Sequence, residues 1–476
     1  MLAITAGVGL VLLLTSGRGG YFADELYFRA AGQHMDWGYA DQGPLVPLLA
    51  RAMDTLFPGS LVGIRLPVTV LTAVGVMVAA LIARELGGLR RAQVLTAGMY
   101  AMGMLFIGHT LNTTAPDVLA WTVTTWLLVR WIRLRDDRLL LALGGLTAIA
   151  LQNKWLMVAF WLVVGVSVLV VGPRELLRRP ALWLGAAIAT LAALPGLFWQ
   201  ARHGWPQLAV AQAIGDGEFV SGRLTRLAFL PLVLVSAGIL LGAVLFCYGL
   251  WRLLRSPELH PYRFLGWTFL GLAVIFLIAG GRCSYVVGLF AVCWAAGAVE
   301  LQRREPARWW RWVLSWPVYA LSAIIALTTL PVPPASWPTL AKPISLAGLG
   351  WPELTETVAG AYRALPPASQ RSTVVITEWY GDAAAIDRFG PVRGLPRAYS
   401  GSRGYWYFGA PPDDANTVLF VGSDPTSLHR YFTEVDRVAT VTTGPMMNFF
   451  SRPTPVWLCS GQRIPWSRLW PQLRHF

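Results

Sequence analysis

The chain has 476 residues, of which 55% are apolar and only 13% are charged, and this composition indicates an integral membrane protein. The net charge of +14 comes almost wholly from Arg, because only two lysines are present. The Arg residues fall in short clusters between apolar runs, which points to membrane topology rather than to nucleic-acid binding. The four cysteines lack metal-ligand spacing and imply no disulfide framework.

Eleven apolar runs are candidates for membrane-spanning helices, each judged against the ~20 residues that a span needs. Several runs are shorter, which indicates tilt or burial within a bundle. The first run is followed by no small-residue cleavage site, so we interpret it as a retained span. The expected spans are Leu2–Thr15, Leu66–Ile82, Val94–Gly108, Val118–Leu128, Leu139–Leu151, Trp155–Val171, Leu182–Trp199, Leu227–Leu250, Phe264–Ile278, Tyr285–Val299 and Trp312–Leu330.

Arginine clusters recur in the links after every second span, beginning at Arg84, Arg130, Arg174, Arg252 and Arg303. Positive residues mark cytoplasmic loops, so we expect these links and the N-terminus in the cytoplasm of a multi-pass plasma-membrane protein. The remaining links and everything beyond the last span are then extracytoplasmic. The expected outer links are Tyr21–Pro47, Thr110–Asp117, Gln152–Lys154, Gln200–Arg226 and Gly281–Ser284.

Two domains are expected, a transmembrane domain over residues 1–330, with amphipathic helices in an outer loop at 18–65, and a small extracytoplasmic α/β domain over 331–476. Pro331–Pro352 is rich in proline and indicates a linker or a surface loop. Beyond it, β-branched runs predict strands and the segments between them predict helices. The expected strands are Thr373–Thr377, Thr417–Gly422 and Val438–Thr443, and the expected helices lie around Tyr362 and at Ala383–Phe389 and Ser427–Phe432.

The first outer loop carries two adjacent carboxylates, Asp24 and Glu25, soon after the first apolar run. Charges at the edge of the hydrocarbon are costly unless a partner or a wet cavity receives them, so this pair is a functional candidate. The alternative is that both acids begin an amphipathic surface helix, because acids are favoured at helix N-termini.

Further polar residues collect on the same predicted outer face. A site that joins acids to cations there can serve transfer from an anionic lipid, because an acid withdraws a proton from an attacking hydroxyl while cations neutralise the leaving phosphate. No P-loop, dinucleotide or GxSxG pattern is present, which argues against nucleotide-driven chemistry. The candidates are Asp24, Glu25, His34 and Asp41 in the first loop, His109 and Asp117 in the second, Lys154 in the third, Arg202 in the fourth, and Arg282 and Tyr285 in the fifth.

Structural interpretations of several candidates stay open. In a chain that otherwise uses Arg, the presence of Lys154 suggests that a compact point charge is required at this position. Alternatively, Lys154 and Arg282 are cations at helix ends whose side chains extend to the membrane surface. Asp117 fits a first-turn acid of the following helix. His34 and His109 lack a partner at i+3 or i+4, so metal binding rests on no spacing motif, although first-loop acids could hold a divalent ion with a lipid phosphate.

The residues resemble those of the GT-C glycosyltransferases, in particular the family-39 protein mannosyltransferases and the bacterial aminoarabinose transferases of lipid A. The similarity runs in order along nearly the whole chain. It rests on FADELYF, DQGPLVPLLAR, Leu66–Pro67, TTAPDVLAW, LQNKW, GGRCSYVVGLFA and TEWYGDAAAIDRFG…LPRAYSGSRGYWYFG.

The resemblance implies a polyprenyl-phosphate sugar donor, an inverting displacement and an acceptor hydroxyl on a glycan, lipid or protein outside the membrane. It makes Asp24 the general base, Glu25 its neighbour in positioning the donor or acceptor, Asp117 a second acid and Lys154 a phosphate contact. Two departures matter: Gly43 stands where relatives often have Pro, and Arg282 stands near an expected lysine.

Three other functions remain as alternatives. A lipid or sugar transporter would use the same cavity without making bonds, although the paired broken helices and internal repeat that favour one are absent from the sequence. A scaffold protein for cell-envelope assembly would have a degenerate site that no longer catalyses a reaction. A lipid-linked oligosaccharide transferase would move a whole glycan rather than one sugar.

Overall fold

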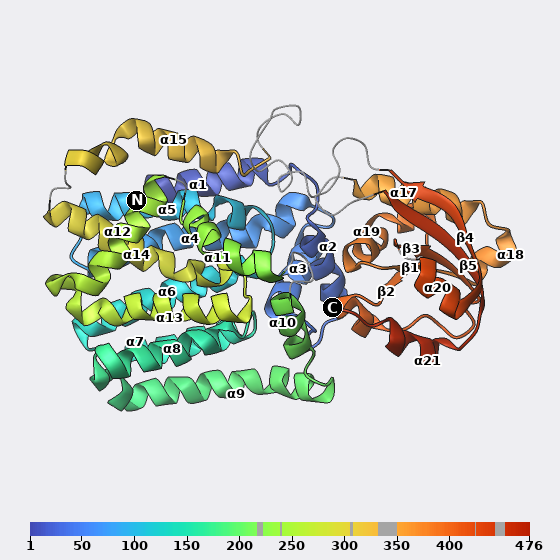
Figure 1. The fold of residues 1–476 in the computed structure, drawn as a ribbon, viewed down its shortest axis with the longest axis horizontal. Coiled ribbons are helices and arrows are strands. Elements are labelled where there is room, and N and C mark those ends of the chain that lie inside the picture. Colours follow the sequence, from blue (N-terminus) through green and yellow to red (C-terminus); the bar gives the residue numbers. More distant parts are fainter. Residues whose placement is uncertain (217–221, 239, 305–307, 332–349, 424, 443–452) are drawn as a thin grey trace.

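The computed structural model describes residues 1–216, 222–238, 240–304, 308–331, 350–423, 425–442 and 453–476. Helices of the N-terminal part lie side by side in a bundle, and the C-terminal part forms a sheet domain at one end of it (Figure 1). The short helices α2 (Ala23–Gln33) and α3 (Leu45–Leu56) lie between the two parts.

Most helices of this part coincide with apolar runs of the sequence. The helices are α1 (Leu2–Thr15), α4 (Leu61–Glu85), α5 (Arg90–His109), α6 (Thr114–Leu134), α7 (Arg138–Leu151), α8 (Leu156–Val171), α9 (Pro180–Arg202), α10 (Pro206–Asp216), α11 (Gly222–Ser236), α12 (Leu241–Arg255), α13 (Arg263–Ala279), α14 (Phe290–Arg303) and α15 (Trp316–Leu327). Short 3₁₀ segments join them at η1 (Arg174–Arg178), η2 (Pro257–Tyr262), η3 (Cys283–Leu289) and η4 (Arg308–Leu314). Helix α10 lies instead in the expected outer link Gln200–Arg226. The run Leu227–Leu250 is divided between two helices that meet at a bend of 102°, and the run Tyr285–Val299 is divided between η3 and α14.

Among the described residues, four helical segments are long and apolar enough to cross a membrane, or five if the bent pair forms one span. The expected count of eleven spans is therefore not confirmed by length and composition. Four further apolar helices are only 10–17 residues long, less than one perpendicular crossing requires. The four long segments are Leu61–Glu85, Pro180–Arg202, Pro257–Ala279 and Cys283–Arg303.

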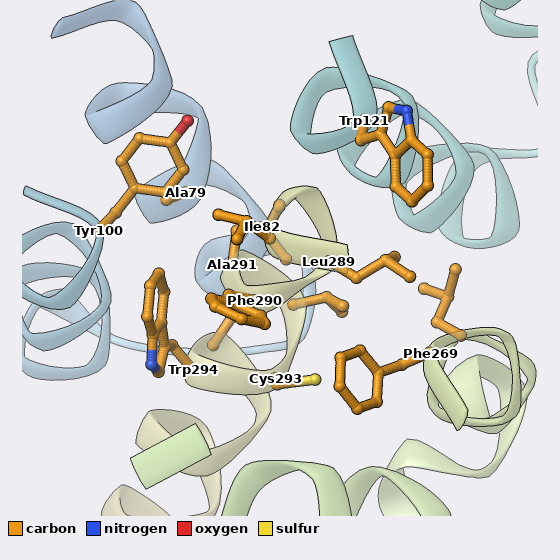
Figure 2. Packing of buried hydrophobic residues seen from close by; sticks show 14 of the residues in the cluster. Ala79, Ile82, Tyr100, Trp121, Phe269, Leu289, Phe290, Ala291, Cys293 and Trp294 are labelled. Atoms are coloured by element: carbon orange, nitrogen blue, oxygen red, sulfur yellow. The ribbon is translucent and has the colours of Figure 1, made fainter. Parts of the chain in front are cut away.

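The core of the bundle forms around α14, whose residues Phe290–Glu300 are all buried. The Phe290 ring lies 4.9 Å from Phe246 of α12 and 5.6 Å from Trp294, measured between ring centroids. Figure 2 shows these α14 side chains among residues from α4, α5 and α13. A helix that is apolar all round must be covered on every side, which places α14 at the centre of the bundle.

Two buried glutamates pair with the arginine clusters predicted to face the cytoplasm. Glu85 at the end of α4 accepts from Arg130 and Arg133. Glu300 of α14 accepts from Arg252 at 2.7 Å and from Arg303 at 3.1 Å. Because a buried carboxylate without a partner is strongly unfavourable, these ion pairs tie the helix ends together.

The C-terminal domain is built on a five-stranded mixed sheet in the order β2-β1-β3-β5-β4. β1 runs parallel to β2 and β3, whereas β5 runs antiparallel to β3 and β4. The strands are β1 (Thr373–Thr377), β2 (Ala398–Ser400), β3 (Thr417–Val421), β4 (Phe432–Val441) and β5 (Thr454–Gln462). The helices are α17 (Trp351–Arg363), α18 (Pro367–Arg371), α19 (Tyr380–Phe389), α20 (Pro425–Tyr431) and α21 (Trp466–Leu469), with 3₁₀ segments η5 (Pro391–Arg393), η6 (Arg403–Phe408) and η7 (Trp470–Leu473).

The sequence predicted part of this domain. Thr373–Thr377 is β1 as expected, and Thr417–Gly422 and Ala383–Phe389 agree with β3 and α19 within a few residues. The strand expected at Val438–Thr443 begins earlier, at Phe432, and its last residue lies outside the described part, as does most of the expected linker Pro331–Pro352. The strands β2 and β5 were not predicted, because β2 is only three residues long and β5 contains Pro455, Ser460 and Gly461.

The sheet domain packs directly on α2. Tyr21, Tyr27 and Phe28 share one buried apolar cluster with residues of α17, α19 and β3. The indole of Trp351 in α17 donates a hydrogen bond to the carbonyl of Tyr21 at 2.7 Å. The first loop and the C-terminal domain are therefore packed as one unit.

Candidate active site

Two carboxylates of the first loop face tyrosines that approach from different elements. The hydroxyl of Tyr380, at the start of α19, donates to Asp24 Oδ1 at 2.7 Å. The hydroxyl of Tyr27, on α2, donates to Asp41 Oδ1 at 2.9 Å. The two phenol rings lie 5.2 Å apart, so both acids belong to one cluster.

Burial fixes the protonation of this cluster. Removal from water raises the pKa of Tyr380 and of Tyr27 well above the ordinary value of 10.0, and the nearby carboxylates raise both pKa values further. Both phenols therefore stay protonated and act as hydrogen-bond donors. Burial also raises the pKa of Asp41, while Arg403 and the Tyr27 hydroxyl act in the opposite direction.

Lys154 faces the same cluster from the link between α7 and α8. Its ammonium lies 5.6 Å from the centre of the Tyr285 ring. Burial lowers the pKa of Lys154, the charge of Asp117 opposes this most strongly, Arg282 adds to the lowering, and Asp24 and Asp41 oppose it. Three carboxylates therefore act on the charge of Lys154, two from the first turns of helices α2 and α6 and one from the first loop.

Backbone pairing sets the position of Lys154. The Gly43 amide donates to the carbonyl of Asn153 at 3.1 Å, and the Leu45 amide donates to the carbonyl of Gln152 at 3.0 Å. A β-carbon on Gly43 would lie only 2.1 Å from the Gln152 oxygen. The glycine that departs from the family pattern therefore permits the close approach that brings the first loop against the Lys154 link.

Asp117 lies in the first turn of α6 and is buried, with only 4% of its surface exposed. Its Oδ1 atom has no hydrogen-bond partner among the described residues. Buried polar atoms are nearly always satisfied, so this oxygen is available to bind a further group. The first-turn placement expected from sequence is confirmed, and the side chain acts electrostatically on Lys154.

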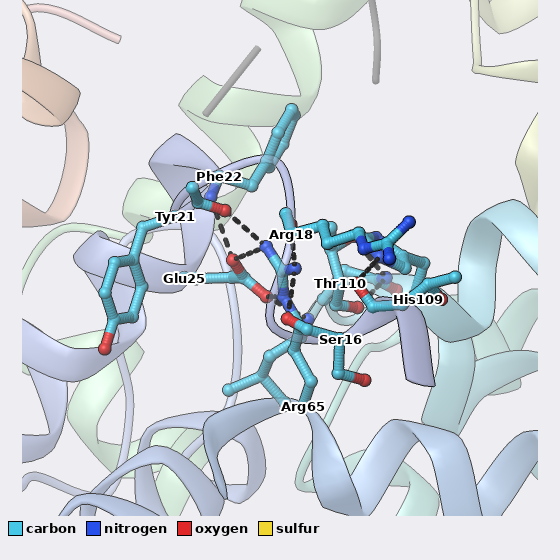
Figure 3. A network of polar contacts seen from close by, with 12 residues as sticks. Ser16, Arg18, Tyr21, Phe22, Glu25, Arg65, His109 and Thr110 are labelled. Carbon is cyan, nitrogen blue, oxygen red and sulfur yellow. Dashed lines mark hydrogen bonds and ion pairs between the residues drawn. The ribbon is translucent and has the colours of Figure 1, made fainter. Parts of the chain in front are cut away.

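Glu25 belongs to a separate network of polar contacts with Arg65 and Phe22 (Figure 3). Arg65 of α4 donates to both of its oxygens at 2.8 Å, and the amides of Phe22 and Leu111 donate to them at 2.8 and 2.9 Å. Arg65 also donates to the carbonyls of Ser16, Arg18 and Gly20. Glu25 therefore anchors the start of α2, which is a structural role.

The remaining sequence candidates lie outside the acid cluster or at its margin. His34 stacks on Phe408 of η6 with ring centroids 4.6 Å apart, and buried His109 lies 3.2 Å from the carbonyl of Thr15, beside the Arg65 network. Arg202 lies over the ring of Phe198 on its own helix at 4.1 Å. Arg282 is exposed, and its charge acts on Lys154.

Groups of three or more His, Cys, Asp or Glu side chains that could hold a metal ion are absent from the described residues. Asp24 and Asp41 instead share their surroundings with the cation Arg403. This donor set does not fit a divalent ion held by the protein alone, and no step below is routed through one.

A hollow of about 250 Å³, which includes space open to solvent, lies beside the Gly43 turn. It is lined by indole rings and side-chain amides, and the Nε2 atom of buried Gln42 lacks a partner among the described residues. The lining includes Trp37, Gln42, Gln152, Trp155, Gln200 and Gln207.

Comparisons with known proteins identify the fold. Residues 41–199 match the family described as dolichyl-phosphate-mannose-protein mannosyltransferase. The crystal structure of ArnT from Cupriavidus metallidurans bound to undecaprenyl phosphate superposes with a TM-score of 0.61, at 16% identity over 96% of this chain and 97% of that one. The chain has the GT-C fold.

Two further structures share the fold. The apo state of the same ArnT gives a TM-score of 0.61 at 15% identity, again over 96% of this chain and 97% of that one. The Archaeoglobus fulgidus oligosaccharyltransferase in complex with Zn and sulfate gives 0.51 at 13% identity, over 83% of this chain and 62% of that one. Among proteins of curated function, none matches the chain by sequence.

Sequence reasoning missed three residues that this GT-C chain brings to the acid cluster, namely Tyr27, Tyr380 and Arg403. Tyr27 lies in the Asp-Glu segment and could have been found from its spacing, because residues 24 and 27 share one face of a helix. Tyr380 lies in the segment TEWYGDAAAIDRFG, whose sequence does not indicate that its hydroxyl reaches Asp24. Arg403 gave no local signal, because its role depends on how that domain packs on α2.

Proposed function

We propose that the protein is a membrane glycosyltransferase that moves a monosaccharide from a polyprenyl-phosphate donor to an acceptor hydroxyl on the extracytoplasmic side. The observation that carries the proposal is the convergence of Asp24, Asp41 and Asp117 on Lys154 in a chain with the GT-C fold. Such a site pairs groups that accept a proton with a cation that receives a leaving phosphate.

Asp24 is the proposed general base. Tyr380 donates to its Oδ1 atom, so Oδ2 is the atom that we assign to proton uptake. The acceptor oxygen loses its proton to Asp24 and forms a bond to the anomeric carbon. The bond between that carbon and the phosphate oxygen breaks on the opposite side, and the configuration inverts.

Lys154 is the proposed contact for the departing polyprenyl phosphate, with Arg282 and Tyr285 beside it. Burial makes the charge of Lys154 costly, and an arriving phosphate would supply an anion that offsets this cost. Asp117 is proposed to orient Lys154. Arg202 lies on Phe198 and is a weaker candidate for the same role.

The first-loop residues divide between chemistry and support in this proposal. Asp41 flanks the base, whereas Glu25 fixes α2 through Arg65. His34 and His109 support packing through Phe408 and the Thr15 carbonyl. The acceptor is a glycan, lipid or protein, and the hollow lined by Trp37 and Trp155 lies beside the loop that carries Asp41.

The Asp24→Asn variant tests the base. Asn keeps an oxygen that can accept from Tyr380 but cannot take the proton, so transfer should fall by about 10²- to 10⁴-fold. The measurement is transfer of radiolabelled sugar from its polyprenyl phosphate to endogenous acceptors in membranes. The matched control is Asp54→Asn, which removes a carboxylate that pairs with Arg29 at 3.1 Å on the same loop.

Near-normal transfer by Asp24→Asn would remove Asp24 from the role of base. Turnover by the purified protein in detergent, without any gradient, excludes a transporter. A scaffold predicts no turnover and no effect of the substitution. Transfer of a single labelled sugar rather than a longer glycan excludes an oligosaccharide transferase.

A further inference from the structure

Arg403 begins η6 of the C-terminal domain with an unusual backbone conformation. Its φ angle is +48°, in the left-handed region that non-glycine residues seldom occupy. Such a conformation is strained and persists only where the surroundings enforce it. The amide of Arg403 donates to the carbonyl of His475 at 2.8 Å, so the end of the chain holds this turn.

The strained turn directs Arg403 into the acid cluster. Its guanidinium carbon lies 5.1 Å from the centre of the Tyr380 ring, whose hydroxyl binds Asp24. The charges of Asp41 and Asp24 both act on Arg403, and the charge of Arg403 in turn acts on Tyr285. Arg403 therefore contacts the tyrosine that binds Asp24 and interacts electrostatically with both carboxylates and with Tyr285.

The neighbouring glycine makes this approach feasible. A β-carbon on Gly404 would lie 1.9 Å from the hydroxyl of Tyr27, the group that donates to Asp41. Only a residue without a side chain lets η6 come this close to α2. Arg403 and Gly404 therefore belong to a short segment of the C-terminal domain that contacts Tyr380 and Tyr27, the two tyrosines that donate hydrogen bonds to the acids.

We propose that Arg403 is a positioning residue through which the C-terminal domain completes the active site, by holding the Asp24–Asp41 pair in place from above Tyr380. The proposal rests on the proposed function for its effect on catalysis. Its structural part, that Arg403 orders the first loop, stands independently of any reaction.

Charge explains why an arginine is suited to this position. Two carboxylates that face one site repel each other, and a nearby cation offsets this repulsion. The groups that face Asp24 are Tyr380 from α19, Arg403 from η6, Asp41 from the first loop and Lys154 from the α7–α8 link. Lys154 is assigned to the donor phosphate, which leaves Arg403 as the cation from the C-terminal domain that balances the pair.

The test compares full-length Arg403→Gln, Arg403→Lys and Tyr380→Phe proteins in detergent. Arg363→Gln is the matched control, because it removes a positive charge from the same domain where the partner is the exposed Glu356. The first readout is hydrogen–deuterium exchange of the peptides that cover residues 23–43. The second readout is the pair of kinetic constants, kcat and the KM for the polyprenyl-phosphate sugar, each determined separately.

We expect Arg403→Gln to speed exchange in residues 23–43 and to lower kcat by about 10- to 100-fold with little change in KM, because a small misplacement of reacting groups has a cost of this order. Tyr380→Phe should do the same to a smaller degree, and Arg403→Lys should recover part of the loss because it keeps the charge. Arg363→Gln should match the wild-type protein in both readouts.

Unchanged exchange in Arg403→Gln would overturn the proposal whatever the activity. Faster exchange with normal kcat would also overturn it, and so would a raised KM with unchanged kcat, which would make Arg403 a phosphate contact. If the wild-type protein transferred no sugar, the proposed function would fail. The exchange rate of residues 23–43 in Arg403→Gln would then still test the ordering role of Arg403. Faster exchange than in the wild-type protein would support this role, and equal exchange would refute it.

Discussion

At the scale of single residues, the acid pair of the first loop separates into two roles. Asp24 and Glu25 are neighbours in sequence, but successive residues on a helix point about 100° apart. Asp24 therefore faces Tyr380 and the C-terminal domain, while Glu25 faces Arg65 in the bundle. The sequence predicted the segment as a functional candidate, but it could not separate the two acids, because both partners lie far along the chain.

Glu25→Gln should strongly destabilise the protein. The change leaves the Arg65 guanidinium buried at 2% exposure without its carboxylate, and breaking one partner of a buried pair costs about 3–5 kcal/mol. Thermal unfolding in detergent measures the loss. Asp54→Asn, which breaks a more exposed pair with Arg29, should cost no more than about 1 kcal/mol. Equal losses in the two variants would contradict the structural role of Glu25.

Lys154→Met should weaken binding of the donor lipid. The variant keeps an unbranched chain of similar length but removes the charge, and a contact to a charged group is worth about 1.5–3 kcal/mol, or about 10- to 100-fold in affinity. The measurement is binding of undecaprenyl phosphate to the purified protein. Lys154→Arg should retain most of the affinity because it keeps the charge. An affinity unchanged in Lys154→Met would exclude the phosphate role.

At the scale of elements, one loop contact determines the shape of the site. The Gly43 turn pairs with the backbone of Gln152 and Asn153, which fixes Asp41 relative to Lys154. The sequence placed these two links on the same face by the alternation of charge, but it gave no signal that they touch. The contact is possible because Gly43 has no side chain.

Gly43→Ala should disrupt this contact and reduce transfer. The new β-carbon would lie 2.1 Å from a backbone oxygen, which no side-chain rotation relieves, so the loop must move away from Lys154. Gly145→Ala makes the same change on α7, where no atom lies within 4 Å of the added carbon. That control should be neutral or more stable by about 0.5–1 kcal/mol. Comparing activity and thermal stability of the two variants checks the prediction, and equal behaviour would refute it.

At the scale of the whole molecule, hydrophobic patterning predicted more of the fold than of the site. Apolar runs located the bundle helices because each run must leave water, and Thr373–Thr377 was recognised by its β-branched residues. The bend within Leu227–Leu250 and the packing of the C-terminal domain on α2 gave no such local signal. Lys154 and Asp117 were found from charge at the membrane edge, whereas Arg403 required the docked domain.

Docking of the C-terminal domain should depend on the space at Gly404. Gly404→Ala places a β-carbon 1.9 Å from the Tyr27 hydroxyl, so either Tyr27 releases Asp41 or η6 moves off α2. We expect faster hydrogen–deuterium exchange in α2 and lower transfer. Gly360→Ala on α17 is the control, because nothing lies within 4 Å of its added carbon. Helix α2 carries both Asp24 and Tyr27. Unchanged hydrogen–deuterium exchange of α2 in Gly404→Ala would therefore mean that the domain contact does not determine the geometry of the acids.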